Sequence, residues 1–529
     1  MNLVEQTIGQ CLEHRAFLTP LSGGISDESR CFQWKQVQRL SDHLAVRYIK
    51  MGIRRGSHAA IWSLNSPEYV LCMLALHKIG AVAVLVNTAY KAKELLQVLA
   101  ESEAQFLFYG EDGENPHFET ILGALDWQQL SVRPKCVKLE RAVQKDAEGE
   151  LPQEDRKLLE EAESLVKTED TACILFTSGT TSRPKGVMLS HRSLVNNSLE
   201  MSENMHWTSG DIMCIPVPLF HCFGITAGIL CGIHAGAELH LLKHSKSKEI
   251  MEQVQKRRCT VLSGVPTMFL ALVRNRERKN YRLDSLKSGI IAGSPVTPSE
   301  YLEICRELGM EKLQPSYGQT ESSPCITMAG WDDSLQQKAK TVGRAISHVE
   351  ICIKKDGGAP ADGLKDEGEI LTRGYHVMQG YYHRPEETKR VIDQEGWLHT
   401  GDIGYLDENG CLSVIGRKKE MIIRGGENIS PLEIEQCILE LPQVAGVKVV
   451  GVEAEVLKEE IAACILVKAG RKLTGDQVRL HVKAHLANYK VPKYVCFLSE
   501  FPITASGKPC LGTLKELAQR EKEKQDNRI

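Results

Sequence analysis

Short apolar runs alternate with longer stretches of helical periodicity over much of the chain. The runs at residues 81–86 and 172–177 are almost entirely apolar, which is typical of strands buried on both faces of a sheet. Residues 91–104 instead repeat apolar positions at helical spacing, and the longer apolar stretch at 69–79 is interpreted as a helix as well. This alternation predicts mainly parallel α/β sheets. The same pattern predicts strands at residues 105–109, 212–217, 238–242, 260–264 and 289–292, and helices at 225–234, 248–257, 266–274 and 298–308.

The pattern changes after Gly343, where short strands are separated by Gly and Asp turns. This favours a small antiparallel barrel or sheet. From Pro431 the α/β pattern returns. We interpret the acidic, Lys-rich stretch at 140–167 as a solvated connection and residues 515–529 as a frayed terminal helix. The strands predicted in this half lie at residues 349–354, 369–372, 412–415, 421–423 and 446–452, and a helix at 432–440.

Charge and cysteine content narrow the function classes. The 65 Lys and Arg nearly balance the 68 Asp and Glu, so the basic footprint of a nucleic-acid-binding protein is absent. The 17 cysteines are scattered, without a CxxC pair or a Cys/His cluster of zinc spacing, which favours reduced thiols. The N-terminus has no signal-peptide pattern, and His77, Lys78 and Gly80 interrupt the most apolar stretch. We expect a soluble, cytoplasmic protein without a transmembrane segment.

The strongest local signal is the loop at residues 177–186, TSGTTSRPKG, which follows a buried strand and which we expect to precede a helix. Glycine lets the backbone approach an anion, hydroxyls donate to phosphate oxygens, and lysine adds positive charge. A Ser/Thr-rich surface loop is the alternative interpretation. The loop does not satisfy the P-loop pattern, so an ordinary P-loop NTPase is disfavoured.

This loop resembles the phosphate loop TSGTTGxPKG of the adenylate-forming superfamily, which includes acyl-CoA synthetases, peptide-synthetase adenylation domains and firefly-type luciferases. Only Ser182 departs from it. Four further segments resemble family motifs in the same order: residues 317–321 (YGxTE), 400–402 (TGD), 416–420 (GRxKE) and 506–508 (SGK). The resemblance covers nearly the whole chain, and it implies ATP, Mg²⁺ and coenzyme A as ligands.

The resemblance implies a role for each motif, and each role fits the chemistry of its side chain. Tyr317 offers a ring for stacking on adenine, although a lone tyrosine at a strand end is usually a core residue. Glu321 is a hard oxygen ligand suited to Mg²⁺. Asp402 and Arg417 suit the ribose hydroxyls. The implied catalytic residues are Lys508, His221, Thr180 and Glu321, and the implied ATP and AMP contacts are Thr177, Ser178, Gly179, Thr180, Thr181, Lys185, Gly293, Ser294, Pro295, Tyr317, Gly318, Thr320, Asp402, Arg417 and Lys508.

Two conformations of the enzyme also follow from the resemblance. Lys508 is implied to offset the repulsion between the carboxylate and the α-phosphate during adenylation. A small C-terminal α+β domain at residues 418–529 is implied to rotate about Lys419, relative to a large domain at 1–417 built from two parallel α/β subdomains and a small β-barrel. The rotation brings Arg424, Gly425 and Gly426 toward the CoA channel.

The implied acyl pocket is mostly apolar. No Asp occurs between residues 215 and 236, where amino-acid-activating relatives place one, so an α-amino acid is disfavoured. His221 lies beside the acyl carboxylate by resemblance, whereas a satisfied core histidine is the alternative. Residues 456–459 lack the Gly-Glu usual in the C-terminal domain, which affects the expected CoA contacts on that face. The pocket residues are His221, Cys222, Phe223, Thr226, Val265, Met268 and Gln319.

We therefore predict a carboxylate–CoA ligase that forms acyl-CoA, AMP and diphosphate through an acyl-adenylate. Segments such as residues 264–269 and 421–429 resemble medium-chain fatty acyl-CoA synthetases. Carnitine/crotonobetaine or aromatic acid CoA ligases are alternatives, the former because of Ser182. A luciferase-like oxygenase and a catalytically silent acyl- or nucleotide-binding protein are alternatives of other classes. A homodimer is an open expectation.

Overall fold

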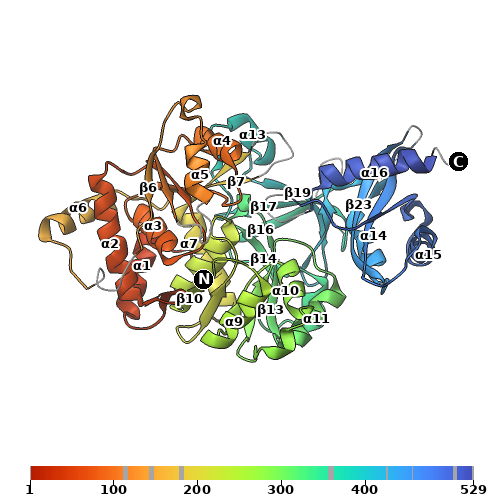
Figure 1. Cartoon of the computed structure of the whole chain (residues 1–529), viewed down its shortest axis with the longest axis horizontal. Helices are drawn as coiled ribbons and strands as arrows, with labels where there is room; N and C mark the ends of the chain where they lie inside the picture. The colour runs from red at the N-terminus through yellow and green to blue at the C-terminus, as the bar shows by residue number, and fades with distance from the viewer. Residues whose placement is uncertain are drawn as a thin grey trace. The chain divides into compact units, whose positions relative to one another are not determined.

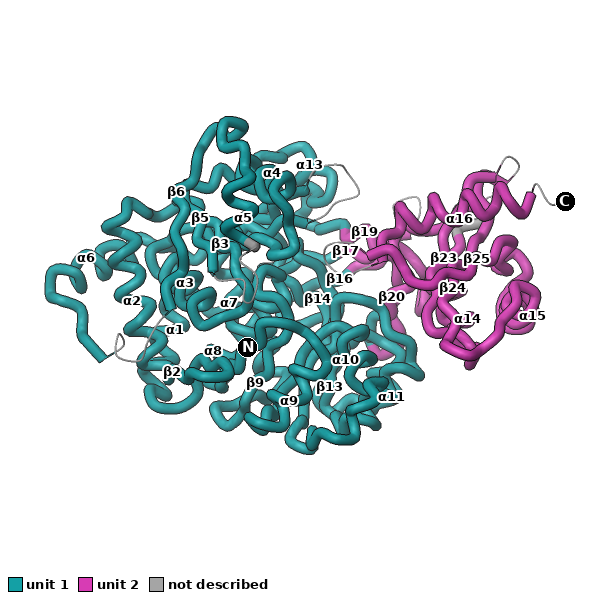
Figure 2. The backbone as a smooth tube through the Cα atoms, viewed as in Figure 1, with its two compact units in different colours: residues 1–351, 372–399, 410–412 teal, residues 352–371, 400–409, 413–529 magenta. Residues whose placement is uncertain are grey.

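The chain forms two compact units in this computed structural model (Figure 2). Unit 1 comprises residues 1–351, 372–399 and 410–412, and unit 2 comprises 352–371, 400–409 and 413–529. The division between the units falls within strands of one four-stranded sheet. The domain boundary that the sequence predicts after Arg417 stays a prediction. The structure describes residues 2–526 except 111–116, 142–147, 178–183, 356–360, 362, 425–426, 455–456 and 504–508.

A seven-stranded sheet with a parallel centre organises one half of unit 1 (Figure 1). Strands β7, β4, β3, β5 and β6 run parallel, whereas β8 is antiparallel to β7 and β18 antiparallel to β8. The order is β18 (Gly380–Tyr381), β8 (Lys185–Ser190), β7 (Thr171–Thr177), β4 (Val82–Leu85), β3 (His58–Trp62), β5 (Phe106–Tyr109) and β6 (Lys135–Lys138).

A nine-stranded sheet organises the other half of unit 1. Its strands from β13 to β1 are parallel, and antiparallel strands flank them at both edges. The parallel α/β prediction is therefore confirmed for the centre of both large sheets. The order is β15 (Arg344–Ala345), β14 (Cys325–Met328), β13 (Lys312–Gly318), β12 (Ser288–Ile291), β11 (Val261–Leu262), β9 (Ile212–Ile215), β10 (Glu238–Leu241), β1 (Gly24–Ser26) and β2 (Cys31–Phe32).

Helices cover both faces of these sheets because successive strand residues point to opposite sides. Ala59 and Ile61 of β3 join one cluster with α3, whereas Ala60 and Trp62 join another with α4 and α5. Strands of both large sheets contribute to the first cluster. The helices are α1 (Ile8–Leu18), α2 (Trp34–Lys50), α3 (Pro67–Lys78), α4 (Ala92–Ser102), α5 (His117–Gly123), α6 (Gln153–Ser164), α7 (His191–Asn204), α8 (Cys231–Ala235), α9 (Ser247–Arg257), α10 (Pro266–Val273), α11 (Pro298–Leu308), α12 (Leu335–Lys340) and α13 (Pro385–Val391), with 3₁₀ turns η1 (Trp127–Gln129), η4 (Arg278–Asn280) and η5 (Thr320–Ser322).

Unit 2 contains a five-stranded sheet with helices on both faces. Val447 and Val449 of β23 pack in one cluster with Ile434 and Val482 of α14 and α15. The alternate residues Val450 and Val452 pack with α16 instead. The strands are β22 (Glu427–Ile429), β21 (Ile422–Arg424), β24 (Lys458–Val467), β23 (Val444–Ala454) and, paired with β24, β25 (Tyr494–Leu498), and the helices are η6 (Lys418–Glu420), α14 (Pro431–Leu439), α15 (Gly475–His485), η7 (Asn488–Lys490) and α16 (Leu511–Asp526).

Several sequence predictions need correction. The 177–186 loop leads into strand β8 rather than a helix, because residues 185–190 pair antiparallel with β7. The stretch at 140–167 contains helix α6, which buries Leu159 and places Glu163 in an ion pair with Lys78. The helix predicted at 225–234 begins as a π-helix, η3 (Gly224–Leu230).

The region after Gly343 does form short strands, as predicted. They make a four-stranded sheet in the order β16 (Val349–Lys354), β17 (Gly368–Gly374), β19 (Leu398–Leu406) and β20 (Leu412–Arg417). Strand β19 had no counterpart among the predicted strands because Gly401 and Gly404 interrupt its apolar pattern. Among the described residues, no helix combines the length and apolar character that a bilayer crossing requires.

Candidate active site

Most predicted contact segments of unit 1 lie at the carboxyl ends of parallel strands. Thr177 ends β7, the exposed Gly293–Ser294–Pro295 loop follows β12, and Tyr317 and Gly318 end β13. Ligands of open α/β sheets bind at such edges. Gly318 cannot be replaced there, since an added Cβ would lie 1.6 Å from the carbonyl oxygen of Pro324.

Asn65 joins the carboxyl ends of the two large sheets of unit 1. It follows β3 and is buried. Its Nδ2 donates to the carbonyl oxygen of Val217 over 2.9 Å, and its Oδ1 accepts the N–H of Leu219 over 3.0 Å. Asn65 therefore fixes the turn that leads into His221. No local pattern predicts this role, because the two segments lie about 150 residues apart.

The predicted acyl-pocket residues after β9 surround the start of the π-helix η3. His221 is exposed, so the alternative of a satisfied core histidine is wrong. Cys222 is buried, and burial raises the pKa of its thiol to about 12, with Glu321 adding to the effect. The Sγ of Cys222 lies 3.6 Å from Thr226 Oγ1. An electrostatic effect of Glu321 on Cys222 places the η5 turn near this segment.

A small cavity lies behind the predicted pocket, between β9, β11 and η3. π-Helical turns are frequent at functional sites. Phe223 belongs to both the predicted pocket and the cavity wall. The remaining predicted residues Val265 and Met268 start helix α10, with Met268 buried, and Gln319 is half-buried. The cavity is lined by Met213, Cys214, Ile215, Val217, Phe223, Ala227, Gly228, Val261 and Ser263.

A chain of contacts connects Lys185 to Glu321. The Nζ of Lys185 lies 2.5 Å from Glu387 Oε2 and 4.8 Å from the ring centroid of Tyr381. The hydroxyl of Tyr381 donates to Glu321 Oε1 over 2.9 Å. Burial and the Glu321 carboxylate raise the pKa of Tyr381, so its hydroxyl remains a donor. Hydrogen bonding by Lys185 lowers the pKa of Glu387.

This contact chain brings together a predicted phosphate ligand and a predicted metal ligand. Strand β8 supplies Lys185, η5 supplies Glu321, and Tyr381 and Glu387 come from β18 and α13. Sequence reasoning missed Tyr381 and Glu387 because an isolated tyrosine and a helical glutamate carry no signal of their own. Only Pro385 at the start of α13 marked a helix there.

Asp402 and Arg417, the predicted ribose ligands, pair within unit 2. The Nε of Arg417 lies 3.0 Å from Asp402 Oδ1. The Asp402 side chain is buried, and that of Arg417 is exposed. The hydroxyl of Thr400 accepts the N–H of Asp402 over 3.1 Å and donates to the carbonyl oxygen of Ile370. The TGD motif therefore orders the carboxylate within the sheet.

The predicted hinge and CoA residues lie in unit 2. Lys419 is exposed in the 3₁₀ turn η6 between β20 and β21. Arg424 pairs with the buried Glu460, with Nε 2.6 Å from Oε2. The predicted residues Ser178, Gly179, Thr180, Thr181, Gly425, Gly426 and Lys508 lie outside the described residues.

Comparison with known families decides the identity. The model of AMP-binding enzymes matches residues 5–382, and that of the AMP-binding enzyme C-terminal domain matches residues 433–508. The chain belongs to the family of AMP-binding enzymes. It is a ligase of the acyl-CoA synthetase group, which acts through an acyl-adenylate.

Two curated relatives cover nearly all of this AMP-binding enzyme. A putative acyl-CoA synthetase of Bacillus subtilis, YngI, is 38% identical over 527 residues and covers 96% of each chain. The mitochondrial medium-chain acyl-CoA ligase ACSF2 of Mus musculus is 34% identical and covers 96% of this chain and 86% of the mouse protein.

Solved structures agree with this assignment of the AMP-binding enzyme. The o-succinylbenzoate CoA synthetase MenE of Bacillus subtilis, in complex with the acyl-adenylate OSB-AMP, is 28% identical with a TM-score of 0.80, covering 97% and 99% of the two chains. The anthranilate CoA ligase AuaEII, with anthranoyl-AMP, has a TM-score of 0.84 at 22% identity, covers 98% of each chain, and shows the fold alone. The predicted fold class is confirmed.

Proposed function

We propose that this enzyme uses ATP to activate an aliphatic carboxylic acid of medium chain length and transfers the acyl group to coenzyme A. The observation that carries the proposal is the mostly apolar lining at β9, β11 and η3, where Phe223 of the predicted pocket borders a small cavity. An aliphatic tail binds to apolar side chains such as these. The carboxylate at its other end has to lie near the phosphate groups of ATP.

In the first step a carboxylate oxygen attacks the α-phosphorus of ATP, and diphosphate leaves. We assign Lys185 to the phosphate oxygens, where it exchanges its pair with Glu387 for a pair with phosphate. His221, exposed at the same end of β9, is assigned to the acyl carboxylate. From the sequence, Thr180 and Lys508 complete the set that stabilises charge on the pentavalent phosphorus.

Glu321 fits a Mg²⁺ ion carried by ATP. It is a half-buried carboxylate, and Tyr381 orients one of its oxygens through a hydrogen bond. Hard oxygen ligands of this kind suit Mg²⁺. When bound, the ion neutralises charge on the phosphate oxygens.

The nucleoside contacts follow the motifs. Tyr317 and the Gly293–Ser294–Pro295 loop are assigned to adenine, and Asp402 with Arg417 to the ribose. Asp402 accepts hydroxyl protons, for which its buried, oriented carboxylate is suited.

In the second step the thiol sulfur of coenzyme A attacks the acyl carbon, its proton is lost, and AMP leaves with the electron pair. We propose that rotation of residues 418–529 about Lys419 separates the two steps. The single turn η6 supports this role, because a short turn between strands absorbs changes in φ and ψ. Arg424, Gly425 and Gly426 are assigned to the CoA channel.

Medium chain length is supported by the ACSF2 relative, and the absence of an Asp between positions 215 and 236 disfavours an α-amino acid. The MenE relative favours an aromatic acid as the second candidate. The deciding experiment measures diphosphate release and thioester formation with short, medium and long straight-chain acids, aromatic acids and betaines, with and without coenzyme A.

We expect the highest kcat/KM for medium straight-chain acids, with thioester formed only when coenzyme A is present. A preference for an aromatic or betaine acid would replace the proposed substrate class. Diphosphate release with none of the acids would overturn the ligase assignment. As a matched pair, Gly228→Ala fits the cavity wall, since an added Cβ would lie 3.5 Å from Ile215, whereas Gly228→Leu fills it and lowers the preferred chain length.

A cytoplasmic location and a homodimer remain predictions from the sequence. Cell fractionation with an antibody against this enzyme tests the first. Light scattering on the purified full chain tests the second, and a monomeric mass would exclude the dimer.

A further inference from the structure

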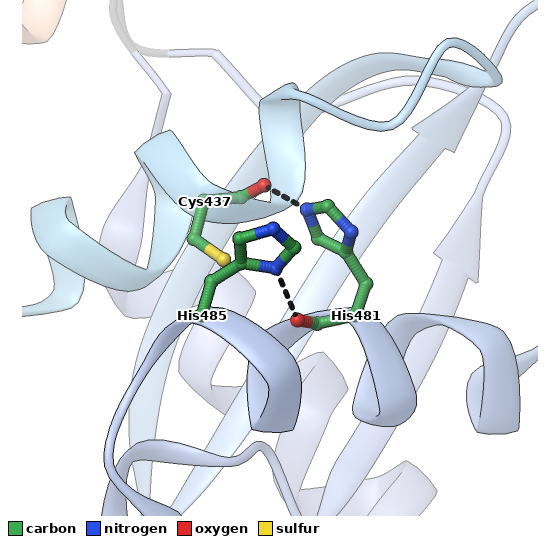
Figure 3. Close-up of side chains that lie close together, drawn as sticks. All are labelled: Cys437, His481 and His485. Carbon is green, nitrogen blue, oxygen red and sulfur yellow. Dashed lines mark hydrogen bonds between the residues drawn. The ribbon is translucent and has the colours of Figure 1, made fainter.

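Three metal-ligating side chains meet between helices α14 and α15 of unit 2 (Figure 3). Cys437, His481 and His485 each present a ligand atom, and these atoms lie within 4.8 Å of one another. None of the three belongs to the motifs assigned to the reaction. The sequence predicted no zinc-type cluster, since Cys437 lies far from the histidines along the chain.

The fold creates this juxtaposition in two steps. His481 and His485 are four residues apart on α15, which puts them on one face of the helix. Helices α14 and α15 pack on the same face of the five-stranded sheet, with Ile434 and Val482 in one apolar cluster. Cys437, near the end of α14, therefore faces the histidine pair.

Hydrogen bonds already orient both imidazole rings. The Nδ1 of His485 lies 2.8 Å from the carbonyl oxygen of His481, so this nitrogen carries the proton and Nε2 keeps the lone pair. The Nε2 of His481 lies 3.0 Å from the carbonyl oxygen of Cys437. The two ring centroids are 4.4 Å apart. A carbonyl partner such as that of His485 orients a histidine ligand in metal sites, whereas the Nε2 of His481 has to give up its bond to the Cys437 carbonyl oxygen if it binds the ion.

The electrostatic surroundings favour a cation. The Oε2 of Glu440 lies 3.6 Å from His481 Nε2. Cys437 is near the C-terminus of α14, and His485 is the last residue of α15. Helix C-termini carry partial negative charge, which adds to that of the Glu440 carboxylate.

We propose that Cys437, His481 and His485 bind Zn²⁺, with Glu440 or water as the fourth ligand. Thiolate and imidazole ligands select zinc over Mg²⁺ or Ca²⁺. In a tetrahedral site the ligand atoms approach to about 3.5 Å, so binding requires small rotations of these side chains from their present positions within 4.8 Å of one another.

Binding releases one proton. The Cys437 thiol loses its proton to solvent as the Zn–S bond forms, and His481 moves its proton from Nε2 to Nδ1 if Nε2 becomes the ligand. The bound ion links α14 to α15 and thereby stiffens one helical face of unit 2. This proposal is independent of the proposed substrate.

The test uses the full chain, purified without a polyhistidine tag and kept reduced. Zn²⁺ titration by calorimetry is expected to give one site per chain. Co²⁺ is expected to produce the near-ultraviolet band of a cobalt thiolate. Cys437→Ser should abolish that band, and His485→Ala should weaken Zn²⁺ binding ~100-fold or more.

Matched controls come from unit 1. Cys136→Ser removes an exposed thiol, and His244→Ala removes an exposed imidazole. Both should leave Zn²⁺ affinity unchanged. A cobalt spectrum without a thiolate band would overturn the proposal, as would equal Zn²⁺ affinity in the wild type and in His485→Ala. Since His485 is exposed, its variant is expected to fold, and circular dichroism verifies this.

Discussion

Lys185 and Lys78 both pair with carboxylates in unit 1, but their surroundings differ. Lys185 pairs with Glu387 over 2.5 Å, lies over the Tyr381 ring, and keeps 21% of its side chain exposed. Lys78 contacts the carboxylates of Glu13, Asp42 and Glu163 and is only 1% exposed.

The comparison shows that solvent exposure distinguishes two roles of a lysine–carboxylate pair. Lys78 ties α3 to α1, α2 and α6, and three carboxylates raise its pKa despite burial. Removing a partner there leaves uncompensated charge in a poorly solvated site. Among the described residues, Lys185 pairs with one carboxylate, and it keeps access to solvent, so the phosphate of the proposed function can displace Glu387 without disturbing the core. The first lysine holds the scaffold, and the second is available for chemistry.

The largest expected effect is on stability, from Lys78→Met. The change leaves three acidic side chains without their cation, so the free energy of unfolding should fall by about 3–5 kcal/mol. Chemical denaturation monitored by circular dichroism measures it. Lys50→Met is the control, since the exposed Lys50 pairs with the half-buried Asp155 and this pair should contribute less than about 1 kcal/mol. Equal losses of unfolding free energy in Lys78→Met and Lys50→Met would contradict the special stabilising role of the buried Lys78.

The next effect is on activity, from Lys185→Ala. If Lys185 binds phosphate as proposed, its loss should lower kcat/KM for diphosphate release by ~10²–10³-fold, with the unfolding transition nearly unchanged. Glu387→Gln should be milder, because it frees Lys185 rather than removing it. If Glu387→Gln were as damaging as Lys185→Ala, the intact pair rather than the free cation would be required.

A pH effect sharpens the account of the Lys78 cluster. Burial raises the pKa of Glu163 from 4.5 to about 7, so the folded protein binds more protons than the unfolded chain between these values. The free energy of unfolding should therefore fall as pH rises through this window, by at most about 3 kcal/mol from this group. Glu163→Gln should reduce this pH dependence of the free energy of unfolding. Identical pH profiles for the wild type and this variant would argue against the raised pKa.

The sequence predicted the strands that end at the site better than the contacts within it. Apolar runs such as residues 172–177 identified buried strands, and local motifs identified Lys185, Glu321 and Asp402 as ligand candidates. Local motifs cannot identify Asn65, Tyr381 or Glu387, because each acts through packing between segments distant along the chain.

The same limit explains two other outcomes. We expected a helix after the 177–186 loop. The antiparallel pairing with β7 that makes this segment the strand β8 is a tertiary property, which a local pattern does not show. The sequence predicts no Cys/His cluster of zinc spacing, because the histidines that face Cys437 lie on another helix. The periodicity of apolar residues indicates which face of a helix or strand is buried. It does not indicate which side chains from distant segments pack against that face.

The smallest effect concerns the link between Lys185 and Glu321. Tyr381→Phe keeps a ring beside Lys185 but removes the hydroxyl that donates to Glu321. A hydrogen bond to a charged group contributes about 1.5–3 kcal/mol, so kcat/KM for Mg-ATP should fall by ~10- to ~150-fold. Tyr382→Phe is the matched control, since its hydroxyl bonds Glu103 instead. The loss should appear in KM for Mg-ATP, because the hydroxyl orients Glu321 before any bond is broken. A loss confined to kcat, or an equal loss in Tyr382→Phe, would contradict a role for Tyr381 in positioning Glu321.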